Sequence, residues 1–172
     1  GLGHSGGYPM GGMDRPWVGI TYGVSGGNGS IGSQEELAEY CVDDPETKLL
    51  WMYMEGIKKP EVVYRLFKKC IDRKVPCVVH KYGRSRKGAI SASSHTGNLA
   101  GSYESFRAVF DKYGVLSPDG VEEYYGLESV LDTLKGNLPR SNRFAIVCRS
   151  GGEATMSADL AERHGLFLPD IT

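Results

Sequence analysis

Short apolar runs alternate along this chain with segments in which apolar residues recur every three or four positions. The short runs predict strands, whereas the spacing of the other segments predicts amphipathic helices. This alternation is typical of successive β-α units that build a parallel sheet, so the sequence predicts an α/β fold. The predicted strands are residues 17–22, 48–54, 76–82 and 143–148, and the predicted helices are residues 33–43, 60–71, 103–113, 121–134 and 152–164.

Capping residues mark several of the predicted helix ends. Ser33 and Glu36 stand three positions apart, as in a capping box, and Pro60 suits the first position of a helix. Gly114 suits a helix end, because glycine adopts the left-handed conformation found there. Residues 83–102 are rich in glycine and serine and predict a long loop.

The β-α pattern restarts after residues 136–142, which have the composition of a linker. We therefore expect residues 1–137 to form one domain and residues 138–172 to form the first β-α unit of a second, truncated domain. Residues 1–12 are rich in glycine, and such a loop normally follows a strand, which the given sequence does not contain. We expect the chain to be part of a longer protein.

Composition narrows the class of function. The chain has 172 residues, of which 40% are hydrophobic and 24% charged, as in ordinary globular proteins. A net charge of -1 provides no basic excess for a nucleic-acid backbone, and no stretch approaches the roughly 18 apolar residues of a membrane span. We therefore expect neither nucleic-acid nor membrane partners. Since no secretory signal opens the chain, we expect a cytoplasmic protein. The cysteines lack C-x-x-C spacing, so we expect buried, reduced thiols and no metal site: Cys41, Cys70, Cys77 and Cys148.

Ligands of open parallel sheets collect at the carboxyl ends of the strands, where loops lead into helices. Four features of this sequence fall at that edge, and we expect them to converge in space. They are residues 23–32, Glu55 with Gly56, residues 83–102, and residues 150–152.

His95 lies among small, hydroxyl-bearing residues and follows several basic residues, a composition that suits an anion. A neutral imidazole is a competent nucleophile toward phosphorus, and the resulting phosphate needs N–H and hydroxyl donors around it. An alternative of similar weight is a loop histidine that makes only a polar contact. The donors that flank the histidine are Ser93, Ser94, Thr96 and Gly97.

Glu55 follows a strand predicted to be buried, where a carboxylate needs a partner to offset its desolvation. An imidazole would fit, because a carboxylate on one ring nitrogen fixes the tautomer and leaves the other nitrogen free to attack. Alternatively, Glu55 caps a helix or pairs with Lys58 or Lys59.

Three glycine-containing turns suggest further sites. Residues 150–152 stand between a predicted strand and a helix, so their N–H groups and the helix dipole favour an anion. Residues 1–6 fit G-x-G-x-x-G and residues 3–7 fit G-x-S-x-G, but both motifs require a strand immediately upstream. A phosphate-binding turn is one alternative here, and a serine hydrolase that uses Asp119 and His164 is another.

Four segments occur in an order and spacing that closely resemble the ADP-forming acyl-CoA synthetases. They are residues 43–57 (DDPETKLLWMYMEGI), 81–102 (KYGRSRKGAISASSHTGNLAGS), 145–152 (AIVCRSGG) and 158–172 (ADLAERHGLFLPDIT). The string S-S-H-T-G-x-L-A-G-S is highly specific to that family, and succinyl-CoA synthetases have a more distant relative of it.

The resemblance implies a flavodoxin-like, three-layer parallel sheet and the start of a second similar domain. It implies that acyl-CoA and phosphate give acyl phosphate and CoA, that a histidine takes the phosphoryl group, and that ADP collects it as ATP. By motif that histidine is His95, and Glu55 resembles the carboxylate that steadies it. The residues implied around the phosphate are Ser94, Thr96 and Gly97, with Ser150, Gly151 and Gly152 at one helix mouth and Ser5, Gly6 and Gly7 at another.

The same resemblance implies cofactors and partners outside this chain. They are CoA, ATP or ADP, Mg²⁺, a CoA-binding Rossmann domain, an ATP-grasp domain or subunit that holds the nucleotide and metal, and a small carboxylic acid as substrate. We expect an oligomer. The alternative is the regulatory, CoA- or ligand-binding region of a protein acetyltransferase, although such proteins often lack the histidine that this chain keeps.

Overall fold

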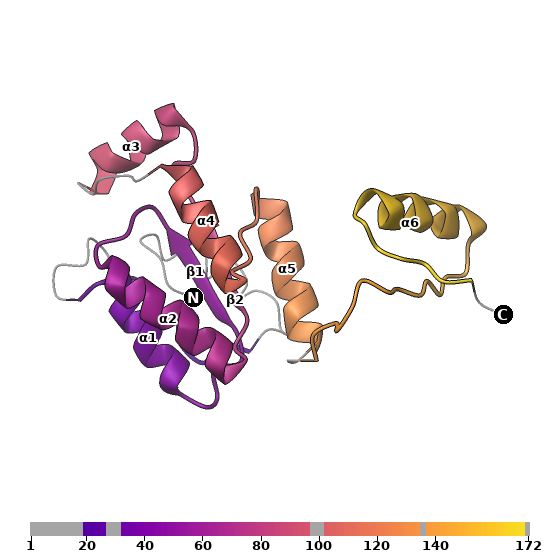
Figure 1. Cartoon of the computed structure of the whole chain (residues 1–172), viewed down its shortest axis with the longest axis horizontal. Helices are drawn as coiled ribbons and strands as arrows, with labels where there is room; N and C mark the ends of the chain where they lie inside the picture. Colours follow the sequence, from indigo (N-terminus) through magenta and orange to yellow (C-terminus); the bar gives the residue numbers. More distant parts are fainter. Residues whose placement is uncertain (1–18, 27–31, 97–101, 135–136, 171–172) are drawn as a thin grey trace. The chain divides into compact units, whose positions relative to one another are not determined.

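The computed structural model describes residues 19–26, 32–96, 102–134 and 137–170, with the backbone alone for residues 93–96. The chain divides into two compact units, Gly1–Gly136 and Asn137–Thr172 (Figure 1).

The first unit contains a parallel sheet. Strands β1 (Leu50–Met54) and β2 (Cys77–Lys81) pair with Leu50 opposite Cys77 and Met54 opposite Lys81. Leu116 extends the sheet by an isolated parallel bridge to Val78. The strands predicted at residues 48–54 and 76–82 are confirmed.

The strand predicted at residues 17–22 is wrong for the part that the structure describes. Residues 19–22 form no strand. Gly19 has no side chain to pack, Ile20 is 38% exposed, and none of residues 19–22 is buried, so this run has no buried face to hold it against a sheet. Residues 17 and 18 lie outside the described residues.

Five helices confirm the sequence predictions. Ser33 and Glu36 form the capping box, in which each side chain meets the backbone N–H of the other. Gly114 ends its helix in the left-handed conformation. The confirmed helices are α1 (Gln34–Asp43), α2 (Pro60–Arg73), α4 (Tyr103–Tyr113), α5 (Val121–Leu134) and α6 (Gly151–Arg163).

A sixth helix, α3 (Arg86–Thr96), corrects the prediction that residues 83–102 form a loop throughout. Ser85 caps this helix, because its Oγ accepts the Gly88 N–H at 3.1 Å and its carbonyl accepts the Ala89 N–H at 2.8 Å. The serine content that suggested a loop therefore includes the residue that starts a helix.

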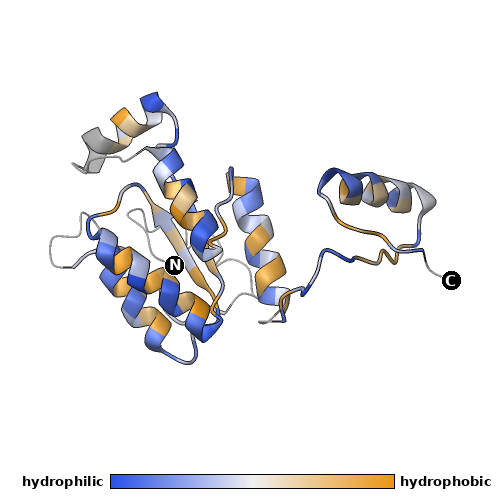
Figure 2. Ribbon diagram, in the orientation of Figure 1, coloured by the Kyte–Doolittle hydropathy of each residue, from blue (hydrophilic) through white to orange (hydrophobic). Residues whose placement is uncertain are grey.

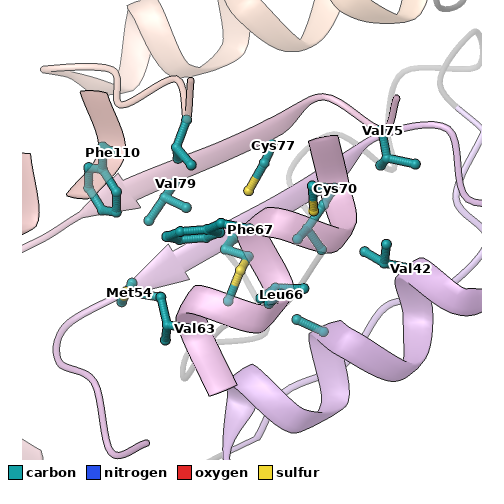
Figure 3. Close-up of a cluster of buried hydrophobic side chains, with 14 of the residues drawn as sticks. Val42, Met54, Val63, Leu66, Phe67, Cys70, Val75, Cys77, Val79 and Phe110 are labelled. Atoms are coloured by element: carbon teal, nitrogen blue, oxygen red, sulfur yellow. The ribbon is translucent and has the colours of Figure 1, made fainter. Parts of the chain in front are cut away.

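Helices cover both faces of the sheet, so the first unit has three layers. On one face, α1, α2 and α4 pack on alternate strand residues that include Met52 and Val79 (Figure 3). On the other face, α5 packs Tyr124 and Leu131 against the intervening residues Trp51 and Val78. Helices α1 and α2 lie side by side, and Figure 2 shows both hydrophobic and hydrophilic residues along each of them, as expected of amphipathic helices.

The second unit contains α6 and a single strand-like contact. Arg143 bridges Phe167, and the Phe144 N–H donates to the Phe167 carbonyl at 2.9 Å. The rest of the strand predicted at residues 143–148 is wrong. In the described part of this unit, the backbone hydrogen bonds that link this run to Phe167 lie only next to Arg143. Without a sheet to cover it, Val147 is 97% exposed.

Candidate functional site

The carboxyl ends of β1 and β2 meet at Lys81. Its side chain is 1% exposed, and its Nζ donates hydrogen bonds to the carbonyl oxygens of Glu55, at 2.8 Å, and of Tyr82. The Tyr82 N–H donates to the Met54 carbonyl at 2.9 Å and so carries the parallel pairing one residue past the two strands. The expected meeting of these two strand ends is therefore present, with a buried ammonium between them.

The Glu55 side chain lies at this edge and accepts a hydrogen bond from a side chain of β1. Its Oε1 accepts a hydrogen bond from the Tyr53 hydroxyl at 2.7 Å. The Tyr53 ring in turn packs against the Tyr82 ring, with 4.5 Å between centroids. The strand that precedes Glu55 thus orients the carboxylate, because Tyr53 belongs to β1 and donates to it.

The first turn of α1 anchors the loop that follows Glu55. The amide of Gln34 donates to a loop carbonyl, the buried carboxylate of Glu35 accepts a loop N–H, and Glu36 pairs with a lysine of the loop. Lys59, one of the proposed partners of Glu55, therefore lies beside Glu36. These three contacts are Gln34 Nε2 to Gly56 O at 3.4 Å, Lys58 N to Glu35 Oε1 at 2.8 Å, and Lys59 Nζ to Glu36 Oε1 at 2.6 Å.

Arg84 anchors the turn that leads from β2 into α3. Its Nε donates to the Lys81 carbonyl at 2.9 Å, and its guanidinium pairs with Asp119 and lies 4.8 Å from the centre of the Tyr103 ring. Its Nη2 also donates to the Ser117 hydroxyl at 3.1 Å. Asp119, the acid considered for a serine hydrolase, is thus the ion-pair partner of a structural arginine.

Gly83 lets α3 approach this turn closely. Its φ of +72° is in the left-handed region, which favours glycine. A Cβ at this position would lie 3.2 Å from the Ala92 Cβ and 3.3 Å from the Gly88 carbonyl oxygen. The base of α3 is therefore fixed by Gly83 on one side and by Arg84 on the other.

The predicted site residues other than Glu55 fall into three groups. Ser94, His95 and Thr96 form the last turn of α3, where the description covers the backbone alone. Ser150 caps α6 through its Oγ, and the exposed Gly151 and Gly152 begin that helix in the second unit. The predicted site residues outside the described residues are Gly97, Ser5, Gly6 and Gly7.

The sequence placed Lys81 only among the basic residues that precede His95, whereas the structure places its buried ammonium between the two strand ends. Burial lowers its pKa to about 8; the nearby Glu55 carboxylate opposes this shift and Arg84 adds to it. A lysine at the end of the apolar run PCVVHKY was the available signal, because a charged residue is rarely buried without a specific partner.

The described residues hold no group of three or more His, Cys, Asp or Glu side chains that could bind a metal ion. All four cysteines are free thiols, and Cys148 is exposed, which corrects the expectation that all four are buried. Across the described residues, every helix falls short of the length and apolar character that a membrane span requires.

Comparison with known proteins identifies the family. The model of the succinyl-CoA ligase like flavodoxin domain matches residues 3–131. Over 157 residues the chain is 37% identical to the ADP-forming acetate–CoA ligase I of Archaeoglobus fulgidus, covering 91% of this chain and 22% of that protein. It is 35% identical to the alpha subunit of the ADP-forming acetate–CoA ligase I of Pyrococcus furiosus, covering 89% of this chain and 32% of that subunit.

A solved structure supports the same family assignment. The dinucleotide forming acetyl-coenzyme A synthetase 1 of Ca. Korarchaeum cryptofilum, in complex with phosphate and ADP, superposes with a TM-score of 0.84 at 27% identity, covering 99% of this chain and 37% of that chain. The chain thus spans only 22% and 32% of the lengths of the two curated relatives above. The flavodoxin-like α/β fold and the resemblance to ADP-forming acyl-CoA synthetases are confirmed. This chain belongs to the family of succinyl-CoA ligase like flavodoxin domains.

Proposed function

We propose that this chain is the phosphohistidine-bearing part of an ADP-forming acyl-CoA synthetase, which converts acid, CoA and ATP into acyl-CoA, ADP and phosphate. One observation carries the proposal: the S-S-H-T-G-x-L-A-G-S string begins in the last turn of α3, a helix anchored at the sheet edge beside Glu55. The relatives named as ADP-forming acetate–CoA ligases support the same reaction.

In this proposal His95 carries the phosphoryl group between two partial reactions. In the ATP-forming direction, a neutral ring nitrogen of His95 attacks the phosphorus of an acyl phosphate, the N–P bond forms, and the P–O bond to the acyl group breaks to release the carboxylate. A terminal oxygen of ADP then takes the phosphoryl group and the histidine regains its neutral form. The Glu55 carboxylate holds the other ring nitrogen as N–H, which fixes the tautomer and stabilises the positive charge of the phosphorylated ring.

The phosphate is held, in this proposal, by N–H groups at helix starts and by the residues that flank His95. The N–H groups at the start of α6 fit an anion, because Ser150 caps the helix and the two glycines that follow leave the site open. We assign the same task to Ser94, Thr96 and Gly97, and to Ser5, Gly6 and Gly7. Unit Asn137–Thr172 would then be the first β-α unit of a second flavodoxin-like domain.

The remaining ligands belong to partner domains. We assign CoA to a Rossmann domain, and ATP or ADP with Mg²⁺ to an ATP-grasp domain or subunit. When bound, the metal ion neutralises the charge of the nucleotide phosphates.

Phosphorylation of the complete enzyme tests the proposal. Incubation with ATP labelled on its γ-phosphate, together with Mg²⁺, should give one covalent phosphate that is lost in acid and kept in alkali, as expected of an N–P bond. Mass spectrometry of the alkali-stable peptides should locate it on the segment that contains His95. Absence of both a labelled histidine and acyl-CoA synthesis would favour the ligand-binding region of an acetyltransferase-type protein instead.

Substituting Glu55 by Gln tests the role of the carboxylate. The amide can still accept one hydrogen bond but carries no charge, so we expect phosphorylation of His95 to slow by roughly 10- to 100-fold while the fold persists. Single-turnover labelling measures the rate, and circular dichroism measures the fold.

Glu46→Gln serves as the matched control, because Glu46 is exposed in the turn after α1. It should label at the native rate. A Glu55→Gln chain that unfolds would instead assign Glu55 a structural role, and one that labels at the native rate would remove it from the mechanism.

A further inference from the structure

Lys81 is buried where an apolar side chain would be expected. It follows the alternation of Cys77 and Val79, which face α2 and α4, and its Nζ lies 4.6 Å from the centre of the Phe106 ring of α4. The ring face favours the cation, and two carbonyl oxygens accept its hydrogen bonds. The ammonium therefore has partners, yet almost none of its surface meets water.

Keeping a charge in this position opposes folding. Burial lowers the pKa of Lys81 to about 8, so the group remains an ammonium at neutral pH although its charged form is disfavoured relative to water. The charged groups that act on it are Glu55, at the end of β1, and Arg84, in the turn after β2, whereas α4 contributes the uncharged Phe106. A methionine of similar length would fill the site without this desolvation.

The two carbonyls that Lys81 holds belong to the two segments that the proposed reaction brings together. One is the backbone of Glu55 itself, and the other is Tyr82, which precedes the close contact between Gly83 and α3. Arg84 adds a third link, because its Nε binds the Lys81 carbonyl. A shift of either strand end would therefore change the distance between the carboxylate and the base of the histidine-bearing helix.

We propose that Lys81 is a positioning residue for phosphoryl transfer, which locks the backbone of Glu55 to the base of α3 so that the carboxylate and His95 keep one relative geometry. The inference rests on the function proposed above. Lys81 is too buried to contact a substrate, so it acts through Glu55 and α3 and leaves substrate binding unchanged.

Lys81→Met in the complete enzyme tests the inference. A displacement of about 1 Å between reacting groups can cost on the order of 100-fold in rate, so we expect the maximal rate of His95 phosphorylation by ATP to fall at least about tenfold. The KM for ATP should stay within about twofold, because no substrate contact is removed. Quench-flow labelling measures both quantities, and thermal unfolding reports the folded fraction.

Lys68→Met is the matched control, because Lys68 is an exposed lysine of α2 that pairs with Asp72. It should label at the native rate. If Lys81→Met does not fold, Lys81→Gln replaces it, because the glutamine side chain is uncharged and one atom shorter and should release at least one of the two carbonyls. A slow but folded Lys81→Gln enzyme supports the inference, and one with the native rate overturns it.

Three outcomes separate this inference from the proposed function. A folded Lys81→Met enzyme that labels at the native rate, while His95→Ala takes no label, overturns the role of Lys81 alone. The same conclusion follows if labelling of Lys81→Met decreases only in proportion to the fraction of the enzyme that is unfolded. A His95→Ala enzyme that labels like the native one overturns the proposed function, and the inference about Lys81 with it.

Discussion

Replacing His95 with alanine is expected to abolish covalent phosphorylation and to lower the rate of ATP-dependent acyl-CoA synthesis at least about a thousandfold. The reason is chemical, since alanine has no nitrogen to accept the phosphoryl group from an acyl phosphate. The substitution should affect the two partial reactions differently. The variant should still exchange acyl-CoA and phosphate for acyl phosphate and CoA, a step that precedes the histidine, and should fail to pass the phosphoryl group to ADP.

His164→Ala provides the control. His164 is exposed at the carboxyl end of α6, where its backbone N–H caps the helix, so loss of its side chain should change neither labelling nor synthesis. Isotope exchange between acyl-CoA and labelled phosphate measures the first partial reaction, and ATP formation from ADP measures the second. Native rates of ATP formation by His95→Ala would show that ADP takes its phosphoryl group directly from the acyl phosphate.

Most of the fold could be predicted because its elements carry strong local signals. Pro60 begins a helix whose apolar residues recur at helical spacing, and Val63, Leu66, Phe67 and Cys70 among them are buried in the core in the structure. The run before Glu55 is apolar on both faces, and the structure covers both faces with helices. Local pattern and tertiary burial agree at these positions, so either one predicts the other.

The errors occur where structure depends on neighbours or on a single cap. Helix α3 was missed because its serines and glycines are typical of loops, although Ser85 caps the helix. The single bridge of Leu116 to Val78 is too short to leave a pattern. The run at residues 143–148 is apolar enough for a strand, but a strand forms only where a partner offers hydrogen bonds along its length.

Individual residues of the candidate site could be predicted from the sequence, whereas the contacts between them could not. Glu55 stood out because a carboxylate follows an apolar strand, and the basic residues before His95 were visible in the sequence. The contact between Lys81 and the Glu55 carbonyl depends on the register that sets Lys81 opposite Met54, one residue before Glu55. Register comes from the packing of both strands against their helices, which a single sequence does not specify.

Phe67→Ala is expected to lower the free energy of unfolding of the first unit by about 3–5 kcal/mol. Phe67 of α2 is 0% exposed, and its ring lies 6.0 Å from that of Phe110 and 6.1 Å from that of Tyr113, both in α4. Figure 3 shows it near the middle of the cluster, close to Val79 of β2. Alanine would leave a cavity where α2, α4 and the sheet meet. Urea unfolding of the 172-residue chain, followed by circular dichroism, measures the change.

Ile71→Ala is the matched control, because Ile71 belongs to the same helix and is 53% exposed. It should change the free energy of unfolding by no more than about 0.5 kcal/mol. A loss below about 1 kcal/mol for Phe67→Ala would mean that the cluster closes around the missing ring, against the packing described here. The comparison also bears on the site, because Val79 and Lys81 share the sheet face that Phe67 supports, so a weakened cluster should loosen the strand end that holds Glu55.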